Sequence, residues 1–460
     1  MSFARQSVTT FATRILISFI NLPVSIIIVR TLGATGQGIY SATATLTTLW
    51  VIFGLMGIDA AHTYLLAGRR ASMGQIVANS LLLTAVLSII LIPGFILLAP
   101  LAVGEEASDF SRYVGLASLA IPLILVRYFL LSVFLGRRKI GTFNILHALS
   151  TLSLLAMIAL FLTFLRMGPR GAVLAYVSSG LVFAVGAAVW VRRMERPDEG
   201  WDLRPSMKHF RFSIIYGLKG HFATLLSQFN YRFDMILVLR WLGTASQGYY
   251  SIAVILAEKL THLTASVQLV LFPYVSGMDK EDANRLTPRA CRHTLVWVAV
   301  TGAALILIGP IVMPILYTED FEQALPAFRV LIPGIIALTL SKLLSSDLSG
   351  RNRRGLPTIA MAVAFALNLG LNIILIPRHG ILGAAWASTS SYTLQTLLTI
   401  IFFCRVSGVP AIDLFLWRKD DYQLYGRLMR RAQSMAGRTR GHDDSDPILP
   451  GPPVDPDGPA

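Results

Sequence analysis

The stretch RTLGATGQGIYS, which begins at Arg30, returns with few changes as RWLGTASQGYYS, which begins at Arg240. The two copies are 210 positions apart. A second pair of similar stretches, GPRGAVLAYVSS from Gly168 and GILGAAWASTSS from Gly380, is offset by 212 positions. Similar segments at nearly one offset indicate that the chain is built from two equivalent halves.

The composition places these halves in a membrane. Of the 460 residues, 54% are hydrophobic and only 14% are charged, and the mean hydropathy is +0.62. A helix needs about 20 mainly apolar residues to cross the hydrocarbon core. About twelve stretches meet this requirement, at roughly 11–31, 39–66, 76–100, 114–135, 143–165, 171–191, 213–240, 248–275, 294–316, 325–346, 357–377 and 381–404.

The repeat predicts how these spans are arranged. Its two copies end the first and seventh spans, and an even number of spans between them makes both copies run in the same direction. We therefore predict an all-α polytopic membrane protein of about twelve transmembrane helices, in two six-helix lobes related by a parallel repeat. The predicted divisions are an N-terminal lobe at 1–208, a C-terminal lobe at 209–405, an interfacial amphipathic segment at 406–431 and a disordered tail at 432–460.

The charge pattern predicts the orientation. The formal net charge is +15, and most of the 40 Lys and Arg fall in alternate connections, whereas the other connections include the acidic runs GEEASD and TEDFEQ. This bias is typical of a multi-pass protein of the cytoplasmic (inner) membrane with both termini in the cytoplasm, and it gives no support for nucleic-acid binding. The first apolar run is expected to remain as a span, and the 2 cysteines predict no structural disulfide.

The repeated motif itself predicts a tight turn between antiparallel helices, because glycine accepts positive φ angles. Its tyrosines, Tyr40 and Tyr250, are then expected near the outer membrane interface, where an aromatic ring with a polar end is favoured.

Charged residues inside spans are the candidate functional groups, because each costs about 3 kcal/mol near the bilayer centre without a partner or a wet cavity. The basic ones are Arg127, Lys219, Arg232, Lys259 and Lys342. The seventh span is the richest. At 100° per residue, it carries His221, Gln228 and Arg232 on one face, and Lys219, Asn230 and Asp234 on another.

The eighth span holds Glu258 and His262, four residues apart and therefore expected to be adjacent on a helix. Two interpretations stay open: the pair exchanges protons, or Glu258 neutralises Lys259 or another cation in a static network. For Arg127 and Lys342, which hold similar places in the fourth and tenth spans, cavity lining and ion pairing between helices are both compatible with the sequence.

The sequence gives no sign of catalysis. It has no glycine loop ending in Gly-Lys for ATP, no Cys/His cluster with metal-ligand spacing, and no paired carboxylates in an outward connection. We expect no catalytic residue, no cofactor and no metal site.

Three segments carry a resemblance to a known family: the repeated LGxxxxGxYS turn, YRFDMILVLRWLG before its second copy, and SGRNRRGLPTIAMAVAFALNLGLNIILIPRHGILGAAWASTSSY from Ser349. Over about residues 1–405 the chain resembles oligosaccharide flippases of the Wzx type, in the multidrug/oligosaccharidyl-lipid/polysaccharide exporter superfamily. The last segment is the most specific, with Asn368, Asn372, Pro377, Gly380, Gly383 and Ala384 in family-like order. Some relatives have fourteen spans, whereas about twelve are expected here.

The resemblance implies two lobes around a cavity lined mainly by spans one, two, seven and eight, which opens alternately to each side. The implied substrate is an undecaprenyl-diphosphate-linked oligosaccharide for O-antigen, capsule or exopolysaccharide. Membrane lipids and the polysaccharide polymerase and export machinery are the implied partners.

Under this hypothesis the cavity cations Arg232, Lys219 and Lys259 hold the diphosphate, with Arg127 and Lys342 as further lining groups. Gln228 and Asn230 meet sugar hydroxyls, and the ion-coupling candidates are Glu258, His262 and Asp234. Two alternatives remain: an ion-coupled drug antiporter of the same superfamily, which a cationic cavity disfavours, and a membrane-embedded glycan polymerase or ligase, which the small outward connections disfavour.

Overall fold

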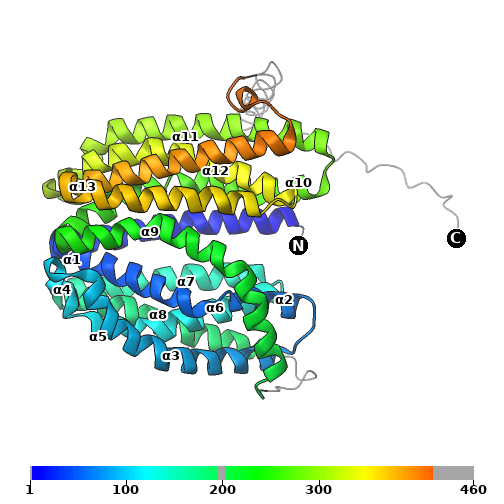
Figure 1. Ribbon diagram of the computed structural model, residues 1–460. Helices are drawn as coiled ribbons and strands as arrows, with labels where there is room; N and C mark the ends of the chain where they lie inside the picture. The colour runs from blue at the N-terminus through cyan, green and yellow to red at the C-terminus, as the bar shows by residue number, and fades with distance from the viewer. Residues whose placement is uncertain (1–2, 194–202, 418–460) are drawn as a thin grey trace, which may run out of the picture.

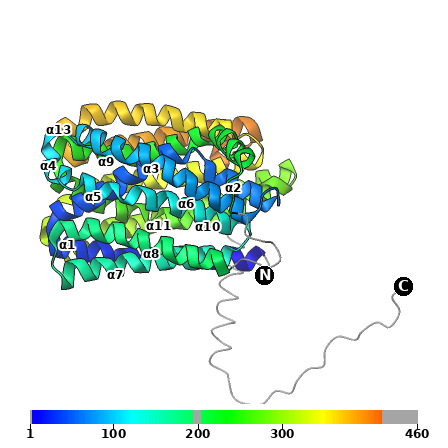
Figure 2. The same ribbon diagram turned by 90° about the horizontal axis from the view of Figure 1, so that it is seen from below.

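The protein is described by a computed structural model that covers residues 3–193 and 203–417. Within these residues the chain folds into helices joined by short connections. The N-terminal half, blue to cyan, forms most of one layer and the C-terminal half, green to orange, forms most of the other, while the green helix Met207–Glu258 begins beside the N-terminal helices and crosses to the other layer (Figure 1). Viewed at right angles, the long helices run side by side across the molecule (Figure 2).

The helices follow the apolar stretches predicted from the sequence. The N-terminal half contains α1 (Phe3–Leu55), α2 (Ile58–Ala67), α3 (Met73–Val103), η1 (Glu105–Ala107), α4 (Ser108–Ser111), α5 (Val114–Ser118), α6 (Ala120–Gly136), α7 (Ile140–Ile158), η2 (Ala159–Phe164) and α8 (Gly168–Arg193). The C-terminal half contains α9 (Met207–Glu258), α10 (Thr261–Gly277), α11 (Lys280–Leu316), η4 (Glu319–Ala324), α12 (Leu325–Gly350), α13 (Gly355–Ser407) and η5 (Ala411–Leu414).

Three of these helices are each two crossings joined at one glycine. Gly33 in α1 has φ 65°, Gly243 in α9 has φ 79°, and Gly380 in α13 has φ 60°, so the chain reverses there without a loop. Gly168, which opens α8, has φ 63°. The four glycines are the turn residues of the two sequence repeats. The eight crossings that flank these turns, together with α3, α5–α6, α11 and α12, make the expected twelve among the described residues. The fold class is confirmed.

Among the described residues, eight helices meet a simple length-and-hydropathy criterion for crossing a membrane. Two of them, α1 and α13, contain a pair of crossings each. The helix α9 is absent from the eight, and it is the helix that carries Lys219, Arg232 and Asp234. The chain is a multi-pass membrane protein.

We call the end of the bundle with Gly33, Gly168, Gly243 and Gly380 the turn end. The opposite end is the basic end, because its connections hold Arg69, Arg137, Arg192 and Arg351. The predicted lobe boundary near 208 follows the undescribed segment 194–202 and stays a prediction. The predicted interfacial segment 406–431 and the tail 432–460 lie largely outside the described residues; where described, the segment forms the short 3-10 helix η5 rather than an amphipathic α-helix.

At the turn end, the two copies of the repeated motif bind each other. The amide Nε2 of Gln37 donates to Ser251 Oγ at 3.1 Å, and Nε2 of Gln247 donates to Ser41 Oγ at 3.3 Å. Each residue of one bond lies 210 positions from its counterpart in the other. The two copies of the motif therefore contact each other in equivalent ways, across a pseudo-two-fold axis between the halves.

The first residue of each motif copy, Arg30 or Arg240, also makes hydrogen bonds to the opposite half. Arg30, in the N-terminal half, donates through Nε to the carbonyl oxygen of Leu316 at 3.1 Å and through its guanidinium to that of Ile315, at the end of α11. Arg240, in the C-terminal half, donates to the carbonyls of Leu101 and Ala102 near the end of α3. Each arginine thus caps the C-terminus of a helix in the opposite half, where a cation also stabilises the helix dipole.

The motif tyrosines correct one expectation. Tyr250 is fully buried and its hydroxyl donates to Asp234 Oδ2 at 2.5 Å. Tyr40 packs edge-on against Tyr176, with ring centroids 6.1 Å apart. Tyr250 is therefore enclosed by protein and does not anchor the chain at the membrane interface, whereas Tyr40 is half-buried and its place at the interface stays a prediction.

Candidate functional site

A cavity of about 320 Å³ lies between the two halves. The N-terminal half contributes polar side chains of α1 together with Tyr128 of α6, and α9 contributes the rest of the polar lining. The polar lining residues are Gln37, Tyr40, Ser41, Thr45, Thr48, Tyr128, Gln228 and Arg232. Since Gln37 and Ser41 also form the bonds between the motif copies, the cavity reaches the closed turn end.

Arg232 is the cation of this cavity, and it is paired. Its guanidinium donates to Glu258 Oε2 at 3.1 Å, and the two side chains are 33% and 32% exposed. An ion pair that keeps a third of its surface exposed inside a membrane protein faces a wet space. The sequence predicts that Gln228 and Arg232 share one face of the seventh span with His221; both Gln228 and Arg232 line this cavity, and His221 does not.

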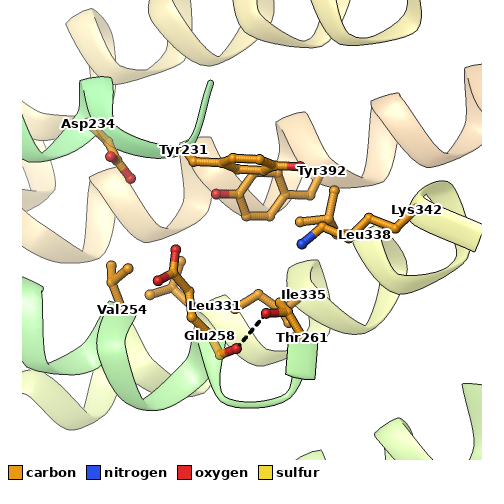
Figure 3. Close-up of a pocket in the computed structure, with 10 residues that line it drawn as sticks. All are labelled: Tyr231, Asp234, Val254, Glu258, Thr261, Leu331, Ile335, Leu338, Lys342 and Tyr392. Carbon is orange, nitrogen blue, oxygen red and sulfur yellow. Dashed lines mark hydrogen bonds between the residues drawn. The ribbon is translucent and has the colours of Figure 1, made fainter. Parts of the chain in front are cut away.

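Glu258 also borders a second cavity, of about 50 Å³, inside the C-terminal half. Figure 3 shows the rings of Tyr231 and Tyr392 together near its centre, with Asp234 to one side and Lys342 to the other. The Arg232–Glu258 pair therefore forms a wall between the large and the small cavity.

The other two expected diphosphate ligands do not join Arg232 in the large cavity. Lys259 Nζ donates to Ser18 Oγ at 2.9 Å and to the Ser18 carbonyl at 3.3 Å, so it connects the second half to α1. Lys219 is exposed on α9, next to the exposed apolar Ile215 and Phe222. One helix cannot aim residues 219 and 232 in the same direction, and the start of α10 turns Lys259 toward α1.

The expected adjacency of Glu258 and His262 rests on a regular α-helix, and the chain departs from one there. Between α9 and α10 the amides of Lys259, Leu260 and His262 each bond to the carbonyl three residues earlier. At this tighter 3-10 pitch, residues three apart lie above one another, so Glu258 and Thr261 share a face, and the adjacency of Glu258 and His262 stays a prediction. Accordingly, Thr261 Oγ1 bonds to the Glu258 carbonyl at 2.8 Å.

Asn230 was expected to meet sugars, and it lies inside the C-terminal half instead. Its side chain is 1% exposed, and its Nδ2 donates to Gln395 Oε1 at 3.1 Å. Ser391 Oγ bonds to its Oδ1 at 3.3 Å. Asn230 therefore fastens α9 to α13, as expected for the face of α9 opposite the cavity.

Asp234 belongs to the same buried layer. It is 3% exposed and accepts hydrogen bonds from Tyr250, from Ser388 Oγ at 2.9 Å and from the Met235 amide at 2.8 Å. The network continues from Ser388 to Asn368 and Asn372 on α13. Among residues 3–193 and 203–417, no ion pair of Asp234 occurs, so neutral donors alone satisfy this buried carboxyl.

Arg127 and Lys342 hold equivalent places, and each lies over an aromatic ring. The Arg127 guanidinium carbon is 5.6 Å from the centre of Phe183, and Lys342 Nζ is 5.4 Å from the centre of Tyr231. Such cation–π contacts stabilise a cation away from water. Lys342 lines the small cavity, whereas Arg127 lines neither of the two cavities.

Sequence reasoning missed the N-terminal wall of the large cavity. Its hydroxyl groups belong to Tyr40, Ser41, Thr45, Thr48 and Tyr128. The spacing of Ser41, Thr45 and Thr48 along α1, four and then three residues, is a helical polar stripe that a face count on the second span would have found. In the part of the chain that the structure describes, no group of three His, Cys, Asp or Glu is placed to hold a metal ion.

Comparison with known proteins gives a family and a fold. The model of the family described as "Polysaccharide biosynthesis protein" matches residues 4–279. A curated relative, the probable low-salt glycan biosynthesis flippase Agl15 of Haloferax volcanii, is 22% identical over 413 residues, which are 86% of this chain and 83% of that protein.

Two solved structures share the fold. The lipid II flippase MurJ, in an inward closed conformation, superposes with a TM-score of 0.73 at 16% identity, over 89% of each chain. A multidrug resistance MATE family transporter of the MOP superfamily, in its inward-facing conformation, superposes with a TM-score of 0.70 at 15% identity, over 87% of this chain and 98% of that one.

Proposed function

The chain belongs to the polysaccharide biosynthesis protein family, and from this premise we propose that it is a flippase of lipid-linked glycans. In its finer form, the proposal is that it translocates undecaprenyl-diphosphate-linked oligosaccharide units across the cytoplasmic membrane by alternating access. The observation that carries it is the cavity between the halves, with Arg232 on one wall and a stripe of hydroxyl groups on the other.

This lining matches the two parts of the substrate that cannot cross hydrocarbon. A diphosphate needs cationic donors, and a guanidinium binds phosphate oxygens through paired hydrogen bonds. Sugar hydroxyls need neutral donors and acceptors, which Thr45, Thr48 and Gln228 offer. In this proposal the polyprenyl tail stays in the bilayer, outside the cavity.

The Arg232–Glu258 pair suggests how the head group is taken and released. In the structure, Glu258 neutralises Arg232 at 3.1 Å. A diphosphate that enters competes with Glu258 for the guanidinium, and Glu258 then lies beside Lys342, which lines the same small cavity. Arg232 is then paired with either Glu258 or the diphosphate, and Glu258 with either Arg232 or Lys342. Because no charge is left without a partner before or after substrate binding, the desolvation cost of the exchange stays small.

The contacts between the halves supply the alternation. The turn end is held shut by the two Gln–Ser bonds and the two arginine caps, so access to the cavity must come from the basic end. With the basic end in the cytoplasm, as the charge bias predicts, this is the state that loads substrate. Parting of the motif copies, with closure of the basic end, would release the glycan outside.

For coupling, we propose Asp234 rather than Glu258 or His262. Glu258 already has a cationic partner, whereas Asp234 is a buried carboxyl with hydroxyl and amide donors only. Such a group favours binding a proton or a small cation. Its donors come from both crossings of the α9 hairpin and from α13, so its occupancy can bias how these helices pack.

The test is transport in liposomes. Purified protein is reconstituted with a fluorescent polyprenyl-diphosphate oligosaccharide, and its protection from an external reagent is followed in time. We expect translocation without any joining of sugar units; joining would indicate a polymerase or ligase, and efflux of cationic drugs without lipid translocation would indicate an antiporter.

Arg232→Ala tests the site within this assay, and Arg329→Ala on the exposed surface of α12 is the matched control. We expect Arg232→Ala to abolish most translocation at normal expression, and Arg329→Ala to leave it intact. Unchanged translocation in Arg232→Ala would remove Arg232 from the substrate site. A glycan polymerase and an export apparatus are the proposed partners in the cell, downstream of release.

A further inference from the structure

A groove on the N-terminal half, separate from both cavities described above, has a volume of about 710 Å³. It lies between α3 and α8 with α6 as its floor. The walls are apolar: Val77 and Leu81 on α3, Val126 and Leu130 on α6, and Ala184 and Ala188 on α8. Leu81 and Val185 at its rim are 54% and 57% exposed, so the groove opens toward the lipid-facing surface.

One end of the groove is basic. Arg192 lines it there, in the last turn of α8, at the basic end of the bundle. Trp190 stands two residues earlier, and Trp and Arg together are typical of the head-group level of a membrane. The groove therefore runs from the head-group level into the hydrocarbon, with a cation at its mouth.

The internal repeat shows what the same place looks like when it is filled. The 212-position offset of Gly168 and Gly380 continues along the unbroken helices that follow, and it pairs Ala188 with Ile400 and Val191 with Phe403. In the C-terminal half, Phe403 is fully buried in an apolar cluster with Leu414 of η5, and Ile400 packs against that cluster. In the N-terminal half the smaller side chains of Ala188 and Val191 stand at these two places, and the corresponding space is the groove.

We propose that the groove binds a hydrocarbon chain of an anionic membrane phospholipid, whose phosphate lies on Arg192. An apolar cleft that opens into a bilayer is filled by lipid, and the cation selects a negatively charged head group. The phospholipid is distinct from the transported lipid, because the groove and the cavity between the halves share no lining residue.

The test measures phospholipid binding to the purified full chain. Phosphatidylglycerol and phosphatidylcholine with identical acyl chains are titrated in detergent, and bound lipid is counted by native mass spectrometry. We expect phosphatidylglycerol to bind preferentially. Arg192→Gln should weaken its apparent affinity about fivefold, and Arg193→Gln, at the adjacent position outside the groove, should not.

A second variant fills the groove with the side chains of the other half. Ala188→Ile with Val191→Phe copies Ile400 and Phe403, and it should lose the bound phospholipid; Val189→Phe, on the exposed face of α8, is the control for added bulk. Equal binding of the two phospholipids, wild-type binding by Arg192→Gln and by a folded groove-filling variant, or preference of the groove for undecaprenyl phosphate over phosphatidylglycerol would each overturn the proposal. None of these results depends on transport activity.

Discussion

Gly38 and Gly248 lie back to back where the two halves meet. A side-chain carbon on Gly38 would collide with the Thr244 carbonyl and stand 3.1 Å from the Gly248 amide, and one on Gly248 would collide with the Ala34 carbonyl. Both obstacles are backbone, which cannot move aside as a side chain does. The closed turn end therefore requires glycine at both places.

Gly38→Ala should open the turn end. The added methyl group forces two helix backbones apart, at a cost of about 1–3 kcal/mol to the closed state. In a variant with Cys291 and Cys404 replaced by Ser, a cysteine at cavity residue 45 should react faster with a membrane-impermeant thiol reagent added to intact cells. Gly370→Ala, where an added carbon has open space, is the control and should not change the rate.

Arg30→Ala and Arg240→Ala should shift the same equilibrium by similar amounts. Each removes one cation from a helix C-terminus in the opposite half, worth about 1 kcal/mol, which is about a fivefold change in population. Because the two caps lie on different helices, the double variant should show the sum of both effects. Distances between spin labels at the turn end would measure this shift; no change in the double variant would mean that the caps do not hold the halves together.

Glu258→Gln should separate binding from turnover. Arg232 then keeps its charge without its carboxylate partner, so it binds the diphosphate at least as tightly, while release slows because nothing competes for the guanidinium. The expected pattern is a lower apparent Kd for the lipid-linked glycan together with a several-fold slower translocation. Weaker binding would contradict the proposed exchange.

Lys219→Ala provides the contrast. The sequence places Lys219 among the diphosphate ligands, whereas it lies outside the cavity and on an exposed face of α9. We expect translocation within about twofold of wild type. A loss as large as that of Arg232→Ala would restore Lys219 to the binding site.

Asp234→Asn should uncouple transport from its driving gradient. The amide keeps an oxygen for Tyr250 and Ser388, and it removes the negative charge together with the acceptor of the Met235 amide. Translocation that rises with a proton or sodium gradient in wild type should become insensitive to both. Ser388→Ala keeps the carboxyl and should keep the response. If collapse of both gradients leaves wild-type transport unchanged, Asp234 has no coupling role.

The fold was accessible from the sequence because two independent signals agreed. Apolar length gave the crossings, and the offset of the repeats gave their grouping, while the turn glycines had a local reason in their positive φ angles. The function of the motif was not accessible. That Gln37 and Gln247 meet the serines of the opposite copy depends on how the halves approach, and no property of either copy alone specifies this.

The sequence predicted which candidate site residues share a face only where those residues lie on one regular helix. The 100° rotation per residue correctly separated Arg232 and Gln228 from Asn230 and Asp234 on α9. It does not decide the neighbours of His262, because the backbone between α9 and α10 tightens to a 3-10 pitch, where the four-residue spacing of a regular α-helix no longer applies. It also could not assign Lys259, whose partner Ser18 is contributed by the other half.

The four single-residue reversals leave the turn end nearly bare. Helix passes directly into helix at three of them, and the connections from α3 to α5, through η1 and the short α4, and from α11 to α12, through η4, are short. Among the described residues this end has no extended loop. If the proposed glycan is released here to a partner protein, that partner would have to contact the flanks of the helices within the bilayer plane, or the acidic connectors around Glu105 and Glu319.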